Sequence, residues 1–160
     1  MMKTFSKILV GIDMSENCLP AIKVIRKMIA ETDSRVTFLY VLHSEGEEVG
    51  SFRSLYKREM SADRLISNYV YPRVKEWLTG VDSRLAAKSR LEVRVGSPAE
   101  EILQFAEERD FDLIVAGTHG RSGFKRWWIG SVAERVVRQA ECPVLTVRSR
   151  GEAIDRVTGE

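Results

Sequence analysis

Short apolar runs alternate along the chain with longer stretches in which apolar residues recur at helical spacing. Residues 8–12, 36–42 and 113–116 form continuous runs of apolar or β-branched side chains, the pattern of strands buried on both faces of a sheet. Residues 91–95 alternate between apolar and charged side chains, which predicts a half-exposed strand near a sheet edge. Residues 143–147 complete a set of five predicted strands.

Amphipathic stretches between these strands predict helices. They are residues 21–29, 61–88, 97–106 and 131–140. Pro72 lies inside the second stretch, so the helix should kink there or a second helix should begin. Ser97 and Ser131 each stand at the start of a helical pattern with Glu three residues later, which predicts a capping box at both positions.

Strands that alternate with helices predict an α/β fold with a parallel, doubly wound sheet and helices on both faces. We expect one domain over residues 1–149, followed by a frayed, charged tail over residues 150–160. Ligands of such sheets bind beyond the carboxyl ends of the strands, where the strand order reverses. The strands 8–12 and 113–116 are the most apolar and should be central, so the residues that follow them, Asp13 and Gly117, should meet in one crevice.

A glycine-rich loop of the form G-x2-G-x9-G-S follows the fourth predicted strand. Its defining residues are Gly117, Gly120, Gly130 and Ser131. The loop is longer than the usual connection between a strand and a helix, and it carries Arg121, Lys125 and Arg126 in a span without Asp or Glu. Glycines let a ligand approach the backbone, and a helix N-terminus favours negative charge. This pattern predicts a phosphate or nucleotide site.

Each of these residues also has a structural interpretation that the sequence leaves open. The glycines can serve turns alone, Ser131 can cap a helix, and Asp13 can cap the helix after it instead of contacting a ribose or a metal. The basic loop residues can be solvated surface charges. His119 fits a loop hydrogen-bonding residue better than a catalyst, and the adjacent Trp127 and Trp128 either stabilise the loop or contact a partner.

Composition excludes several other classes. The chain is 44% apolar and 30% charged with a net charge of +2, which is ordinary for a globular protein and gives little support to nucleic-acid binding. We expect no signal peptide and no membrane span, and two cysteines far apart suggest reduced thiols in the cytoplasm. The sequence lacks a P-loop, a Gly-x-Gly-x-x-Gly after the first strand, a Ser/His/Asp arrangement and a metal-ligating cluster.

Four segments resemble the universal stress protein family, and the resemblance extends from Lys7 to Arg148. They are residues 8–15 (ILVGIDMS), 38–41 (FLYV), 96–102 (GSPAEEI) and 112–147, the last of which contains the G-x2-G-x9-G-(S/T) motif of the ATP-binding branch. The resemblance implies a Rossmann-like, adenine nucleotide alpha hydrolase-like domain with strand order 3-2-1-4-5. Tyr40 stands where a His is common in the family, Cys18 where a Ser is common, and Trp127-Trp128 replace an aliphatic pair.

The resemblance also implies a ligand and a set of contacts. The ligand would be ATP, with ADP, AMP and cyclic AMP as alternatives, accompanied by Mg2+ or Mn2+ that Asp13 could hold through water. The implied ATP contacts are Ile12, Asp13, Val41, Gly117, Thr118, Gly120, Arg121, Gly130, Ser131 and Val132. A homodimer would form through the last strand, at Val144, Leu145 and Val147.

Three functions follow from this pattern. The first is a cytoplasmic stress-response or signalling module in which ATP is a structural ligand or switch, with an unidentified protein partner. The second is a slow ATPase that uses Asp13, His119 and a metal, although the sequence contains no convincing general base, so we expect at most weak turnover. The third is a nucleotide-free dimeric adaptor.

Overall fold

The computed structural model describes residues 5–30, 32–43, 61–118 and 130–148. Its centre is a five-stranded parallel sheet in the order β3-β2-β1-β4-β5, which confirms the expected topology. The strands are β1 (Lys7–Ile12), β2 (Arg35–His43), β3 (Arg90–Gly96), β4 (Leu113–Gly117) and β5 (Val144–Val147). β3 lies at one edge, as its alternating pattern predicts, and β5 lies at the other.

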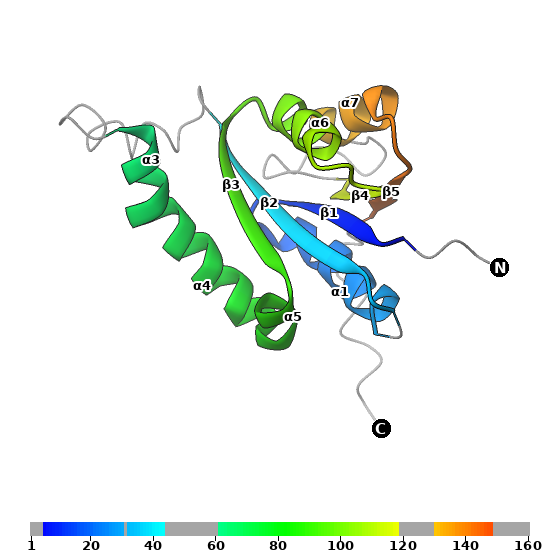
Figure 1. Ribbon diagram of the computed structural model, residues 1–160, viewed down its shortest axis with the longest axis horizontal. Helices are drawn as coiled ribbons and strands as arrows, with labels where there is room; N and C mark the ends of the chain where they lie inside the picture. Colours follow the sequence, from blue (N-terminus) through cyan, green and yellow to red (C-terminus); the bar gives the residue numbers. More distant parts are fainter. Residues whose placement is uncertain (1–4, 31, 44–60, 119–129, 149–160) are drawn as a thin grey trace.

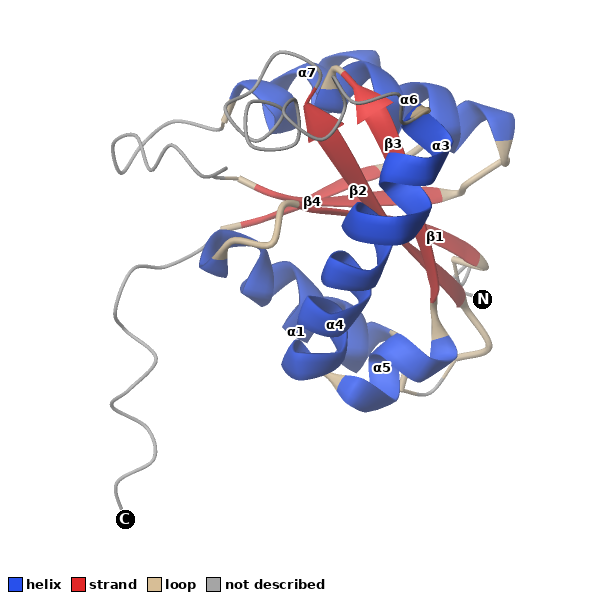
Figure 2. Ribbon diagram, turned by 90° about the vertical axis from the view of Figure 1, so that its left-hand side faces the viewer, coloured by secondary structure: helices blue, strands red, loops and turns tan. Residues whose placement is uncertain are grey.

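Helices cover the sheet on both faces, so the molecule has three layers (Figures 1 and 2). α1 (Leu19–Met28), α4 (Tyr71–Val81) and α5 (Ser83–Lys88) lie on one face, and α6 (Pro98–Glu108) and α7 (Ser131–Gln139) lie on the other. A short 3-10 helix, Glu16–Cys18, precedes α1. No helix within the described ranges has both the length and the apolar character that a bilayer crossing needs.

Alternation along the central strands divides the core in two. Ile8 and Val10 of β1 face α1 and α4, whereas Leu9 between them faces α6 and α7. Successive side chains of a strand point to opposite faces, so a strand without polar residues can be buried on both sides. Leu9 and Val10 are both fully buried, as the continuous apolar run predicts.

Pro72 lies where a new α-helical segment begins, which was one of the two expected outcomes, but the chain stays helical through this point. α3 (Ala62–Leu65) continues through a π-helical turn, Ile66–Val70, directly into α4, and Pro72 lies in the first turn of α4 (Figure 1). Proline has no N–H to donate, and its ring would collide with the carbonyl of the preceding turn. The wider π turn changes the hydrogen-bond pattern where Pro72 would disrupt an α-helix.

Both predicted capping boxes are wrong in their hydrogen bonds. Ser97 is the N-cap of α6 but its side chain makes no capping hydrogen bond, and α7 begins at Ser131 with Gly130 as its N-cap. The glutamates that should complete the boxes are engaged elsewhere. Glu100 accepts a hydrogen bond from Arg135 at 2.8 Å, and Glu134 lies 3.1 Å from Arg138.

Asp112 joins the starts of the two central strands. Its carboxylate accepts hydrogen bonds from the backbone N–H of Ser6 (2.8 Å), the hydroxyl of Ser6 (2.8 Å) and the backbone N–H of Lys7 (2.9 Å). Burial alone would raise the pKa of Asp112, but these hydrogen bonds outweigh it and hold the pKa below its usual value. The contact pins β1 beside β4, and so helps to set which residues meet at their far ends.

Asp112→Asn should therefore destabilise the fold at neutral pH by about 1–2 kcal/mol, because charge-assisted hydrogen bonds are lost. The folded state lowers the pKa of Asp112, so its stabilising effect is present above the unfolded-state pKa of about 4 and is lost as the pH falls through the folded-state value. Urea unfolding of the wild type and of Asp112→Asn at pH 7 and below pH 4 measures the difference in unfolding free energy between them. The difference between the two proteins should shrink in acid, and an equal difference at both pH values would contradict the assignment.

Candidate nucleotide site

A cavity of about 360 Å³ lies at the carboxyl ends of β1 and β4, where the strand order reverses. Eight of the residues expected to contact ATP line it: Ile12, Asp13, Val41, Gly117, Thr118, Gly130, Ser131 and Val132. The other two, Gly120 and Arg121, lie outside the described residues, as do Lys125, Arg126, Trp127, Trp128 and His119. The crevice that topology predicts for Asp13 and Gly117 is therefore present.

Asp13 organises the turn that leaves β1. Its Oδ1 accepts hydrogen bonds from the backbone N–H of Ser15 at 2.9 Å and from the Ser15 hydroxyl at 2.7 Å. Ser15 in turn caps the 3-10 helix by accepting from the backbone N–H of Asn17 at 3.2 Å. Met14 between them has a φ of 59°, a left-handed conformation that non-glycine residues seldom adopt. Asp13 thus acts on the cap through Ser15 while its side chain still lines the cavity.

Gly117 permits a close approach between β4 and the segment before α1. A Cβ at this position would lie 3.1 Å from the backbone oxygen of Asn17 and 3.7 Å from the Cα of Cys18. Any larger side chain would push the two segments apart. The glycine therefore keeps the ends of β1 and β4 together around the cavity.

The start of α7 forms the polar end of the cavity. The N–H of Gly130 donates to the carbonyl of Thr118 at 2.6 Å, and the N–H of Thr118 donates to the carbonyl of Val147 at 3.0 Å. These bonds tie the beginning of α7 to the ends of β4 and β5. The first N–H groups of a helix have no partner within the helix, so this end favours an anion. Ser131, in the first turn of α7, is exposed.

The opposite wall is apolar. Val41 of β2 packs against the core cluster that contains the buried Ile102 of α6, and both residues line the cavity together with Pro98. A Cβ on Gly11 would lie 3.4 Å from the Cδ1 of Ile102, so the absence of a side chain at Gly11 leaves this wall open. An apolar wall facing a helix N-terminus suits a ligand with a flat apolar part and an anionic part.

Pro98 and Ile102 are lining residues that the sequence pattern alone did not assign to the site. A signal for them was present, because the Ser97-Pro98 helix start directly follows the third predicted strand. The sheet is parallel, so the carboxyl end of that strand points the same way as the carboxyl ends of β1 and β4.

Cys18 also lines the cavity, and its side chain is a protonated thiol and not a reactive thiolate. Burial raises its pKa to about 12, and its Sγ donates to the carbonyl of Ser15 at 3.0 Å. A thiol in this state is not a nucleophile at neutral pH.

A divalent metal ion at this site would need oxygen atoms from a bound nucleotide to complete its coordination. The described residues contain no group of three or more His, Cys, Asp or Glu side chains placed to hold a metal ion. Mg2+ is commonly bound by one or two carboxylates together with phosphates and water. Asp13 fits that mode as a single carboxylate facing the cavity.

Comparison with known proteins agrees on one family. The model of the universal stress protein family matches residues 4–148. The universal stress protein MJ0531 of Methanocaldococcus jannaschii is 36% identical over 147 residues, which cover 90% of this chain and 82% of the relative.

Solved structures give the same result for the fold. The structure of MJ0577 from Methanocaldococcus jannaschii has a TM-score of 0.75 at 27% identity, and the match covers 93% of this chain and 99% of that one. A universal stress protein family protein from Arabidopsis thaliana, solved with AMP bound, has a TM-score of 0.62 at 20% identity over 91% of this chain and 93% of its own.

Proposed function

This protein belongs to the universal stress protein family, and we propose that it binds ATP in the cavity at the ends of β1 and β4. In this proposal ATP is a structural ligand or switch of a cytoplasmic stress-response or signalling module. The observation that carries it is the convergence of an apolar wall, the carboxylate of Asp13 and the N-terminus of α7 on one cavity. The Arabidopsis thaliana protein, which shares this fold, was solved with AMP.

Each part of the ligand has a matching surface. The adenine would lie near Ile12 and the Val41 wall, and the ribose hydroxyls would meet Asp13 and Gly117. The phosphates would approach Thr118, Gly120, Arg121 and the first turn of α7 at Gly130, Ser131 and Val132. A bound Mg2+ or Mn2+ would neutralise phosphate charge, with Asp13 reaching it through water. The cavity volume of about 360 Å³ lies within the usual range for small-molecule sites.

A ligand of this kind acts as a switch through linkage. Binding to the folded state alone stabilises that state by RT ln(1 + [L]/Kd), which is about 2.7 kcal/mol at 100-fold over Kd. The same free energy is available to bias a surface that differs between the bound and free states. No chemical step is required for this effect.

The proposal includes a homodimer through β5. Within the described part of the chain this strand pairs with β4 on one side only, and all four of its residues are half-buried. Val144, Leu145 and Val147 pack against the protein's own core, so the exposed feature is the unpaired edge of the strand. An unpaired edge is a template for pairing with a second copy.

The test is to denature the protein as purified, without added nucleotide, and to identify released small molecules by mass spectrometry. We expect adenine nucleotide at a substantial fraction of the protein concentration, and the ratio of ADP to ATP reports turnover. If none is released, titration of the protein with ATP and Mg2+ follows. Absence of binding at about 1 mM ATP, roughly −4 kcal/mol of binding free energy, would contradict the proposal and favour a nucleotide-free adaptor.

A further inference from the structure

A second and larger hollow lies at the opposite ends of the strands. It is a cleft of about 830 Å³ at the amino-terminal ends of β2 and β3, and it continues to α4 and α5. α6 packs over Leu39 in the middle of β2, and the described helices leave the amino-terminal halves of β2 and β3 uncovered in the view of Figure 1. Among the described residues, the cleft and the nucleotide cavity have no lining residue in common.

Cations from adjoining strands line this cleft. Lys7 of β1 is the register partner of Arg35 of β2, and Arg90 of β3 is the register partner of Thr37. Strand alternation places them on the face that carries Leu9 and Leu39. These three basic residues therefore lie on three adjacent strands, about 4.8 Å apart, and Arg90 is offset from Arg35 by two residues, or about 6.6 Å, along the strands.

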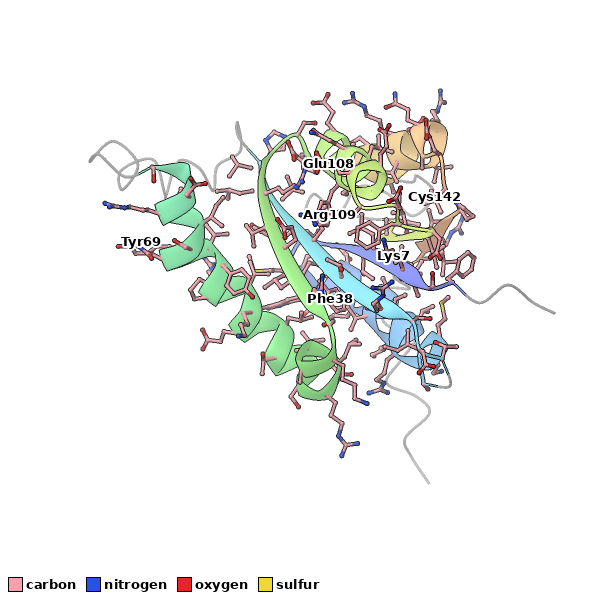
Figure 3. The ribbon with its side chains drawn as sticks, viewed as in Figure 1. Lys7, Phe38, Tyr69, Glu108, Arg109 and Cys142 are labelled. Atoms are coloured by element: carbon pink, nitrogen blue, oxygen red, sulfur yellow. The ribbon has the colours of Figure 1, made fainter. Side chains whose placement is uncertain are left out.

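Two further cations complete the lining. Lys75 contributes from α4, and Arg109 contributes from the residue that follows α6. Lys7 Nζ donates to the backbone carbonyl of Arg109 at 2.9 Å, and Figure 3 shows these two residues in front of the sheet. Glu92 is the only acidic residue among the lining residues in the described part of the chain.

Three of these cations have no ion-pair partner among the described residues. The ion pairs there do not include Arg35, Lys75 or Arg90. Arg94 provides an internal comparison, because it lies on the same strand and face as Arg90 but pairs with both Glu101 and Glu108 and lies 4.5 Å from the centre of the Phe105 ring. The chain thus supplies acidic partners to Arg94 and leaves Arg35, Lys75 and Arg90 without an ion-pair partner among the described residues, whereas Arg109 lies 5.9 Å from the centre of the Phe105 ring.

The arrangement favours side-chain carboxylates over a compact phosphate. The cations come from several elements, and the three on the strands are spread over roughly 12 Å. α6 meets the cleft with its C-terminal end, whose partial negative charge disfavours a phosphate group, whereas the six-residue α5 contributes lining residues from both of its ends. An extended peptide presents alternate side chains about 6.6 Å apart on one face, which matches this spread, and Arg binds carboxylates with two hydrogen bonds.

We propose that this cleft is a docking site for an extended acidic segment of a partner protein, with Asp or Glu at alternate positions. Lys7, Arg35 and Arg90 bind its carboxylates, and Lys75 and Arg109 contact its ends. The site is independent of the proposed nucleotide function, because the cleft lies at the amino-terminal ends of the strands and the nucleotide cavity at their carboxyl ends.

The test uses a fluorescein-labelled peptide of alternating Glu and Thr, measured by fluorescence anisotropy. We expect saturable binding at about 10 mM ionic strength, where the Debye length is about 30 Å, and weaker binding at about 150 mM, where it is about 8 Å. The double variant Arg35→Glu, Arg90→Glu should lower the affinity by tenfold or more, and Arg35→Gln, Arg90→Gln by about tenfold. Both residues are exposed, so the fold should be retained.

The matched control is Lys23→Glu, Arg64→Glu, which makes the same change in net charge at exposed positions outside the cleft. Its affinity should stay within about threefold of the wild type. Equal loss in both double variants, binding of a Lys/Thr peptide, or no binding of the Glu/Thr peptide would overturn the proposal. Displacement of the peptide by stoichiometric tripolyphosphate would assign the cleft to small anions instead, and displacement by ATP would assign the peptide to the nucleotide cavity.

Discussion

Ser131→Glu should abolish the stabilisation of this protein by ATP and leave the fold intact. Ser131 lies in the first turn of α7, is exposed and lines the cavity, at the position proposed for the phosphates. A carboxylate there would repel a triphosphate at short range. The same carboxylate is favourable for the helix, because negative charge near a helix N-terminus contributes about 0.3–1 kcal/mol.

The expected effect is large enough to measure by thermal unfolding. At 100-fold over Kd, ATP should stabilise the wild type by about 2.7 kcal/mol, which raises Tm by about 5–10 °C for a domain of this size. Ser131→Glu should show no rise, although its Tm without ATP should equal or slightly exceed that of the wild type.

Ser131→Gln is the matched control, since it adds the same bulk without the charge. It should retain part of the ATP-induced rise in Tm. Equal rises in the wild type and Ser131→Glu would show that the phosphates bind elsewhere. Loss of the rise in both variants would show that space at residue 131, and not charge, limits binding.

The main features of the fold could be predicted from local patterns. Continuous apolar runs are typical of strands buried on both faces, and Leu9 and Val10 are both fully buried on opposite sides of the sheet. The alternation in residues 91–95 likewise marked an edge strand. The order of the strands came from the resemblance to a family, because periodicity alone does not determine which strands pair.

The candidate site was predictable to the extent that topology determines it. Asp13 and Gly117 follow the two central strands, so their meeting follows from the reversal of strand order. Pro98 and Ile102 were missed because a helix reaches the site from β3, and its packing depends on tertiary structure.

Side-chain partners were the least predictable feature. Glu100 has the spacing of a capping box with Ser97, yet it binds Arg135 of α7, which is 35 residues away in sequence. The basic cleft could not be predicted for the same reason. Lys7, Arg35 and Arg90 are ordinary, separate charges in the sequence until strand register brings them together.

Phe38→Ala should produce a larger loss of stability than Asp112→Asn or any change at Ser131. Phe38 is fully buried in the middle of β2, between its register partners Val10 and Leu91, and it packs in the core between the sheet and the helices α1 and α4 (Figure 3). Removing a buried phenyl group loses its transfer free energy and leaves a cavity, at a cost of about 3–5 kcal/mol. Domains of this size have about 5–15 kcal/mol of stability in total.

Urea unfolding of Phe38→Ala measures this loss, and Tyr69→Ala is the matched aromatic control. Tyr69 is 42% exposed and points away from the sheet in Figure 3, so its removal should change stability by no more than about 0.5 kcal/mol. A similar loss in both variants would contradict the packing described for β2.

Phe38 does not line the nucleotide cavity, so Phe38→Ala should keep the full ATP-induced rise in Tm while starting from a lower Tm. Ser131→Glu should do the reverse, and the two variants together separate the stability of the core from the occupancy of the site.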